Sequence, residues 1–142
     1  MNNKIFLLLV LIILTGCSTT YQSEGLTGGY SEQFTGQNTA TVYYKSNAFT
    51  SMSETRQNAM RRAAELTLQR GYDYFFIESD SQYVKKQEFS GTIQCNSYGY
   101  STTCNNIGGG TFRKPRVQIS IRMFKGSVPN QTGYYDARYL AQ

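Results

Sequence analysis

Few residues of this 142-residue chain are suited to acid–base or nucleophilic chemistry. The chain has no histidine, which removes the commonest general base and the usual partner of a serine or cysteine nucleophile. The clustered carboxylates are Glu65, Asp73, Glu78 and Asp80. A glycosidase needs two carboxyl groups about 5–9.5 Å apart across a cleft, but nearby arginines account for Glu65 and a turn accounts for Asp73. We therefore predict no catalytic residues, and a hydrolase is the alternative that this cluster leaves open.

The three cysteines divide into one near the start of the chain and one pair. Cys17 closely follows an apolar segment, and Cys95 and Cys104 lie nine positions apart in a polar region. An even remainder of cysteines in an oxidising compartment predicts a disulfide, which should contribute about 2.5–3 kcal/mol by the chain-entropy estimate. A zinc site is the alternative, but two thiols without histidine do not complete a tetrahedral shell. We expect no metal and no dissociable cofactor.

Two sets of side chains near this disulfide are candidates for binding. Tyr98 and Tyr100 lie inside the disulfide loop, where amphipathic rings suit recognition of a protein or a glycan, or else pack back on the hairpin. If the hairpin is symmetric about the disulfide, like charges face each other in two pairs, Lys85 with Lys114 and Lys86 with Arg113. Opposed like charges are unfavourable. Three explanations are open. The glycines shift the register, or an anionic partner binds the patch, or the charges extend into solvent along an edge that resists aggregation.

The elements that position these residues follow from periodicity. Strands are predicted at Thr39–Ser46, Tyr72–Glu78, Tyr83–Cys95 and Thr111–Phe124. Between the first two lies one amphipathic helix, which Ser51 and Glu54 begin as a capping box and Gly71 ends. Brief turns on both sides of the helix suggest a crossover between parallel strands. We predict an α+β fold in the order β-α-β-β-β, with one helix on a roughly four-stranded mixed or antiparallel sheet and a disulfide-closed hairpin arm.

The first residues resemble a secretory signal. A basic residue, Lys4, precedes ten apolar residues from Ile5 to Leu14. As a helix these ten residues reach about 15 Å, half of the roughly 30 Å hydrocarbon core, so they do not form a permanent membrane span. We divide the chain into a signal peptide (1–16), a flexible tether (17–38), an α+β domain (39–125) and a tail (126–142). Tyr21, Tyr30 and Phe34 are the tether residues able to dock on the domain, and residues 134–140 could form a short helix.

The order Leu14-Thr15-Gly16-Cys17 resembles the lipobox of bacterial lipoproteins. The resemblance implies cleavage before Cys17, a thioether-linked diacylglycerol on its sulfur and an acyl chain on its new amino group, and two or three such chains make a stable anchor. An ordinary signal peptide with an incidental cysteine is the alternative. Ser18 stands where an aspartate favours the inner membrane of Gram-negative bacteria, so we expect the periplasmic face of the outer membrane.

Charge indicates the kind of partner. Residues 17–142 carry thirteen Lys and Arg against nine Asp and Glu, a net charge of +4. Such an excess suits anionic headgroups, lipopolysaccharide or peptidoglycan. A secreted, lipid-anchored chain would rarely meet nucleic acid, so we expect no nucleic-acid partner.

Several segments together resemble an uncharacterised family of small proteobacterial lipoproteins. Besides the lipobox, they are residues 28–32 (Gly-Gly-Tyr-Ser-Glu), 62–68 (Arg-Ala-Ala-Glu-Leu-Thr-Leu), 71–75 (Gly-Tyr-Asp-Tyr-Phe) and 135–138 (Tyr-Asp-Ala-Arg). The resemblance implies a lipoprotein without catalytic residues. Residues 95–110 depart from the family pattern, so a shared role need not involve the disulfide arm.

The predicted function is that of a membrane-anchored, non-enzymatic envelope lipoprotein. It would act by protein–protein contact in envelope assembly, maintenance or stress signalling. The alternative is a binding module for an anionic envelope glycan, either peptidoglycan or lipopolysaccharide.

Overall fold

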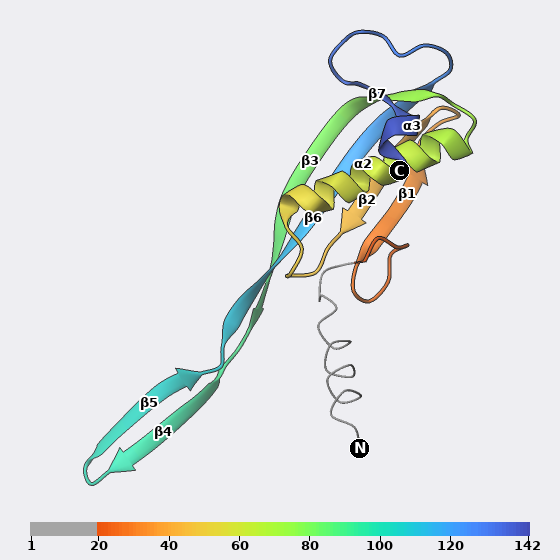
Figure 1. The fold of residues 1–142 in the computed structure, drawn as a ribbon. Coiled ribbons are helices and arrows are strands. Elements are labelled where there is room, and N and C mark those ends of the chain that lie inside the picture. The colour runs from red at the N-terminus through yellow and green to blue at the C-terminus, as the bar shows by residue number, and fades with distance from the viewer. Residues whose placement is uncertain (1–19) are drawn as a thin grey trace, which may run out of the picture.

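The structure, a computed structural model, describes residues 20–142; the apolar run and Cys17 lie outside the described residues. In chain order the elements are β1 (Gly29–Phe34), β2 (Thr39–Lys45), α2 (Met52–Gln69), β3 (Tyr74–Phe89), β4 (Thr92–Tyr98), β5 (Ser101–Ile107), β6 (Gly110–Phe124), β7 (Tyr134–Asp136) and α3 (Ala137–Leu140). Figure 1 shows α2 across one face of a curled sheet and a long two-stranded arm leaving one end of the body. The predicted α+β class is confirmed. Neither α2 nor α3, the helices of residues 20–142, has the length and apolar character needed to cross a membrane.

The main sheet has the strand order β1-β2-β6-β3-β7, and every neighbouring pair is antiparallel. Because β6 pairs with β2 on one side and β3 on the other, β2 and β3 run parallel without touching. The predicted parallel direction of the strands flanking α2 is therefore confirmed, while β6, the strand far along the chain, lies between them.

The prediction of about four strands is too low, and β1 is one reason. This strand lies in the segment predicted as a flexible tether, and it pairs with β2 from Gly29 opposite Lys45 to Phe34 opposite Ala40. Glu32 of β1 faces α2, and its carboxylate accepts a hydrogen bond from the Arg62 guanidinium of α2 at 2.7 Å. A strand that presents an ion pair in place of an apolar side chain has no clear hydrophobic alternation.

The other differences lie at β3, in the hairpin beyond it and at the carboxyl end. β3 joins the predicted strand at 72–78 to the first part of the one predicted at 83–95, in one strand of sixteen residues with a register shift between Ile77 and Ser79. The rest of that second prediction lies in β4, which pairs with the unpredicted β5 in a separate two-stranded sheet. At the carboxyl end, β7 takes up residues 134–136, and Asp136 then caps the short α3 by accepting a hydrogen bond from the Arg138 amide at 2.9 Å. The short terminal helix is thus present but covers four of the seven residues of the predicted span.

Helix α2 begins and ends as predicted. Ser51 is its N-cap and accepts a hydrogen bond from the Glu54 amide at 3.1 Å. Beyond the C-cap residue, Gly71 has a φ of +78°, a left-handed conformation that favours glycine. The buried side of the helix is rich in alanine (Ala59, Ala63 and Ala64), which lets the helix lie close to the sheet.

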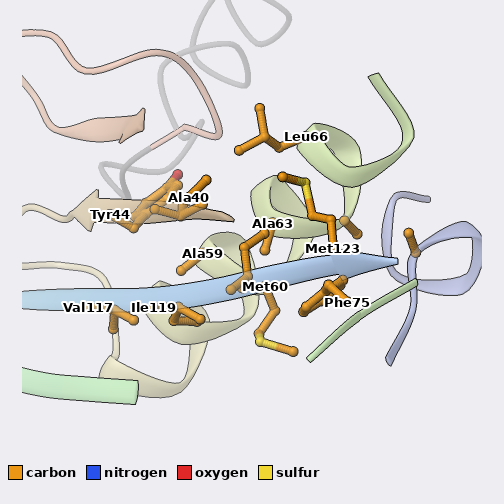
Figure 2. Close-up of a cluster of buried hydrophobic side chains, with 14 residues drawn as sticks. Ala40, Tyr44, Ala59, Met60, Ala63, Leu66, Phe75, Val117, Ile119 and Met123 are labelled. Atoms are coloured by element: carbon orange, nitrogen blue, oxygen red, sulfur yellow. The ribbon is translucent and has the colours of Figure 1, made fainter. Parts of the chain in front are cut away.

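The hydrophobic core lies between α2 and one face of the sheet, as Figure 2 shows. On β6 the residues Val117, Ile119, Ile121 and Met123 are buried, in the predicted alternation. β2 and β3 add Ala40, Val42, Tyr44 and Phe75 to the same cluster. The opposite face of the sheet carries polar side chains such as Gln118, and no helix among the described residues covers it. The body is therefore a two-layer structure with a single core.

The substitution Ile119→Ala tests this arrangement. Ile119 is fully buried at the centre of the sheet, so the change should lower the free energy of unfolding by about 2–5 kcal/mol through lost transfer energy and a residual cavity. Chemical denaturation measures this loss. Gln118→Ala, on the open face of the same strand, is the control and should change stability by less than about 0.5 kcal/mol. Equal effects of the two variants would contradict the assignment of faces.

Candidate functional site

The candidate binding residues all lie on the arm, defined here as residues 83–116. Its register is symmetric about the disulfide: Lys85 faces Lys114, Lys86 faces Arg113, and Cys95 faces Cys104. The predicted opposition of like charges is thus confirmed. The glycines interrupt the pairing between β3–β6 and β4–β5, but the register is the same on both sides of them. A register shift therefore does not relieve the repulsion between these cations.

A glycine joint, formed by Gly91 on one strand and residues 108–110 on the other, lies between the β3–β6 pairing and the β4–β5 pairing. There the two backbones approach each other closely. A Cβ built on Gly91 would lie 2.1 Å from Asn106 Oδ1 and 2.5 Å from the Gly109 nitrogen. Gly108 has a φ of +83°, which residues with a side chain rarely adopt. Glycine is thus required on both strands of the joint, and it lets the arm bend without loss of alignment.

The tip of the arm is a disulfide-closed hairpin. Cys95 and Cys104 are bonded, with their Cα atoms 4.0 Å apart, as the cysteine count predicts. The turn contains Gly99 at a φ of +61°, with Tyr98 and Tyr100 on either side. Tyr98 is 82% exposed and Tyr100 is fully exposed. Of the two expectations for these rings, the one in which they pack back on the hairpin is wrong.

Charge is divided unevenly between the arm and the rest of the described chain. Outside the arm, residues 20–82 and 117–142 carry eight cationic and eight acidic side chains, a net charge of zero. The arm carries five cations against Glu88, a net charge of +4. Among residues 20–142, every ion pair lies outside the arm. Lys114 donates to the neutral amide of Gln87 at 2.7 Å, and Arg116 donates to the backbone carbonyl of Ser46 at 2.7 Å. Ion pairing among residues 20–142 therefore does not offset the positive charge of the arm.

The carboxylates considered for catalysis are held by separate partners. Glu65 binds Arg61 and Arg62 on α2, Glu78 binds Arg122, and Asp80 binds Arg56. Asp73 accepts a hydrogen bond from the Gly126 amide at 2.8 Å. These contacts tie sheet, helix and loop together, and each carboxylate has a structural partner of its own. Among the described residues no three His, Cys, Asp or Glu side chains gather as metal ligands.

A second polar cluster, which the sequence analysis did not find, fixes the start of the described chain. The Tyr21 hydroxyl donates to Glu65 at 2.5 Å, and the Arg62 guanidinium binds Glu32 and Glu65 at 2.7 and 3.3 Å. The Arg62 guanidinium also lies 4.3 Å from the centre of the Tyr30 ring. Tyr21 and Tyr30, which the sequence analysis names as able to dock on the domain, pack against its core. For their polar partners the sequence signal is the spacing of Arg62 and Glu65, which is also that of a solvated helix pair.

Burial and charge act together in this cluster. Burial, with the hydrogen bond to Glu65 and the charge of that carboxylate, raises the pKa of Tyr21 far above its usual value. Burial alone would lower the pKa of Arg62, but its bonds to Glu32 and Glu65 outweigh that effect and raise the pKa. Tyr21 thus stays a neutral donor and Arg62 a cation, so the segment before β1 is clamped to α2.

Comparison with protein families, with curated proteins and with solved structures finds no match to this chain. The candidate site is therefore judged on its geometry, and the arm is the feature that the body's own packing does not require.

Removal of the disulfide tests whether the tip is independent of the body. In the double variant Cys95→Ser with Cys104→Ser, the tip hairpin should lose about 2.5–3 kcal/mol of stability. The body should be unaffected, because every residue of β4 and β5 is exposed. Amide hydrogen exchange should accelerate in residues 92–107 and stay unchanged in α2 and β6. Equal acceleration in both regions would show that the tip supports the core.

Proposed function

We propose that this protein is a bacterial envelope lipoprotein, anchored through lipid on Cys17 at the periplasmic face of the outer membrane. It acts without catalysis, by contact with another envelope protein, and the arm is its recognition element. This proposal keeps the resemblance to the family of small proteobacterial lipoproteins as its basis for the anchor.

The exposed tip of the arm is the observation that carries the proposal. An isolated two-stranded hairpin is marginally stable in water, yet this chain extends one far from its core and closes it with a disulfide. Tyr98 and Tyr100 present large amphipathic rings there at low conformational cost, as anchor residues of protein interfaces do. A partner that covers these rings would explain why the chain keeps a hairpin that buries nothing of its own.

Site-specific photo-crosslinking in cells tests this function. A photoreactive residue at Tyr98 or Tyr100 should capture one discrete envelope protein, whereas one at Tyr139 should not. Tyr139 is a matched control because it is 78% exposed, close to the 82% of Tyr98, and lies on α3 away from the arm. Adducts that are the same at positions 98 and 139, or an absence of discrete adducts, would contradict the proposal. In the same cells Cys17→Ser should release the mature chain from membranes, since it removes the anchor.

The charge of the arm favours a second candidate function, the binding of an anionic envelope glycan. Lys85, Lys86, Arg113 and Lys114 form a basic band with no ion pair among the described residues. Peptidoglycan and lipopolysaccharide both present anionic groups that such a band would attract.

Sedimentation with purified peptidoglycan sacculi tests this alternative. Binding should weaken as salt is raised, because exposed charges are screened, and it should weaken further when all four cations are changed to glutamine. A variant with Arg56, Lys45, Arg122 and Arg138 changed to glutamine removes the same charge from paired positions and should bind more strongly than the arm variant. Equal loss of binding in the two variants would show that binding depends on net charge and not on the cations of the arm.

A further inference from the structure

The two faces of the arm differ in composition. Residues directly opposite each other in an antiparallel pair share a face, and faces alternate along a strand. On β6 the odd-numbered residues from Val117 onward face α2, so even-numbered β6 residues and their β3 partners face away from it. The resulting outer stripe, the face of the arm that continues the open face of the sheet, consists of Tyr83, Lys85, Phe89, Phe112, Lys114 and Arg116.

The outer stripe combines exposed aromatic rings with cations. Tyr83 is 55% exposed, and Phe89 and Phe112 are each 44% exposed. The rings of Phe89 and Phe112 stack with their centres 5.2 Å apart, which confirms that they share this face. Gln87 and Gly110 are the remaining members of the face, so it has no carboxylate between residues 83 and 89 or 110 and 116. The acidic residue of the arm, Glu88, lies on the opposite face with Lys86 and Arg113.

The outer stripe adjoins the turn that precedes β1. A hollow of about 220 Å³ is lined by residues 24–28 of that turn, by residues 45–47 and by Lys114 and Arg116. Its one carboxylate, Glu24, forms an ion pair with Lys45. At the tip of the turn, Leu26 extends fully into solvent. Leu26 therefore adds an exposed apolar side chain beside the cations at the root of the arm.

The same end of the body lies close to the start of the described chain. Tyr21 is clamped to α2 through Glu65, and the Tyr30 amide donates to the Gln22 carbonyl at 2.9 Å. From Cys17 to Thr20 is three residue steps, which span at most about 11 Å. A lipid on Cys17 would hold this end of the body, with Leu26 and the outer stripe, close to the bilayer surface.

We propose that the outer stripe of the arm lies against the anionic phospholipid headgroups of the bilayer that holds the anchor. This inference rests on the proposed lipid anchor. Lysine and arginine are attracted to anionic lipid surfaces, and aromatic rings sit at the level of the headgroups. A planar surface contacts one face of a ribbon, and the face with rings, cations and no carboxylate is the one that fits it. The exposed tip then extends along the membrane and stays free for a partner.

Tryptophan fluorescence tests the orientation, because the chain contains no tryptophan of its own. Tyr83→Trp and Gln82→Trp place a single reporter on adjacent exposed residues of opposite faces, since Gln82 pairs with Val117 on the α2 side. The purified lipoprotein is reconstituted in vesicles of phosphatidylglycerol and phosphatidylethanolamine that contain lipids brominated near the headgroup. The reporter at position 83 should shift its emission to the blue and lose intensity, and the reporter at position 82 should do neither.

Two double variants of equal charge change identify the source of the attraction. With the reporter at position 83, Lys85→Gln with Lys114→Gln should abolish the quenching, because both cations lie on the outer stripe. Lys86→Gln with Arg113→Gln, on the opposite face, should leave most of it. Vesicles of phosphatidylcholine alone should also reduce the quenching, because they carry no net charge.

Equal quenching at positions 82 and 83, or none at either position, would overturn the inference. So would equal loss in the two double variants. The mass of the reconstituted protein is measured in the same samples, so a chain without lipid on Cys17 would refute the anchor instead of the orientation. The Cys17→Ser chain further separates the anchor from the orientation. It should still bind anionic vesicles at low salt through the outer stripe, and failure to bind would contradict the proposed contact between the stripe and the headgroups.

Discussion

Strand β6 is the element on which the rest of the molecule depends. It pairs with β2 on one side and β3 on the other, and its alternate residues from Val117 to Met123 supply the centre of the core under α2. The same strand continues without a break into the arm, where it carries Lys114, Arg113 and Phe112. The register of β6 within the body therefore sets which residues of the β3–β6 part of the arm share a face. Because a slip of one residue would move the apolar set to the wrong face, the buried pairing also fixes which of these arm residues continue the open face of the sheet.

Local sequence patterns predicted the parts of the fold that depend on neighbouring residues. Ser51, Glu54 and Gly71 marked the ends of α2, the alternation after Arg116 marked β6, and the spacing of Cys95 and Cys104 gave the register of the arm. Pairings between distant residues leave no such pattern, so neither the place of β6 between β2 and β3 nor the strand β1 was foreseen. In β1 the inward Glu32 is stabilised by Arg62, thirty residues away, and only the folded chain brings these charges together.

The division of charge gives the two parts of the molecule different relations to their surroundings. In the body, ion pairs such as Arg56–Asp80 and Arg122–Glu78 join separate elements, so charge there serves to hold the fold. Such exposed pairs each contribute little, and they are screened by salt. In the arm, opposed cations repel each other, and they form no ion pair among the described residues. A ribbon with this net positive charge attracts anionic groups nearby.

The absence of buried residues in β4 and β5 has an evolutionary consequence. Side chains beyond the glycine joint make no contribution to the core. Mutations there therefore escape the selection for stability that constrains the sequences of α2 and β6. The tip can diversify rapidly, lengthen or be replaced by another hairpin while the scaffold is inherited unchanged. Related chains would then share the body and differ in the length and sequence of the tip hairpin.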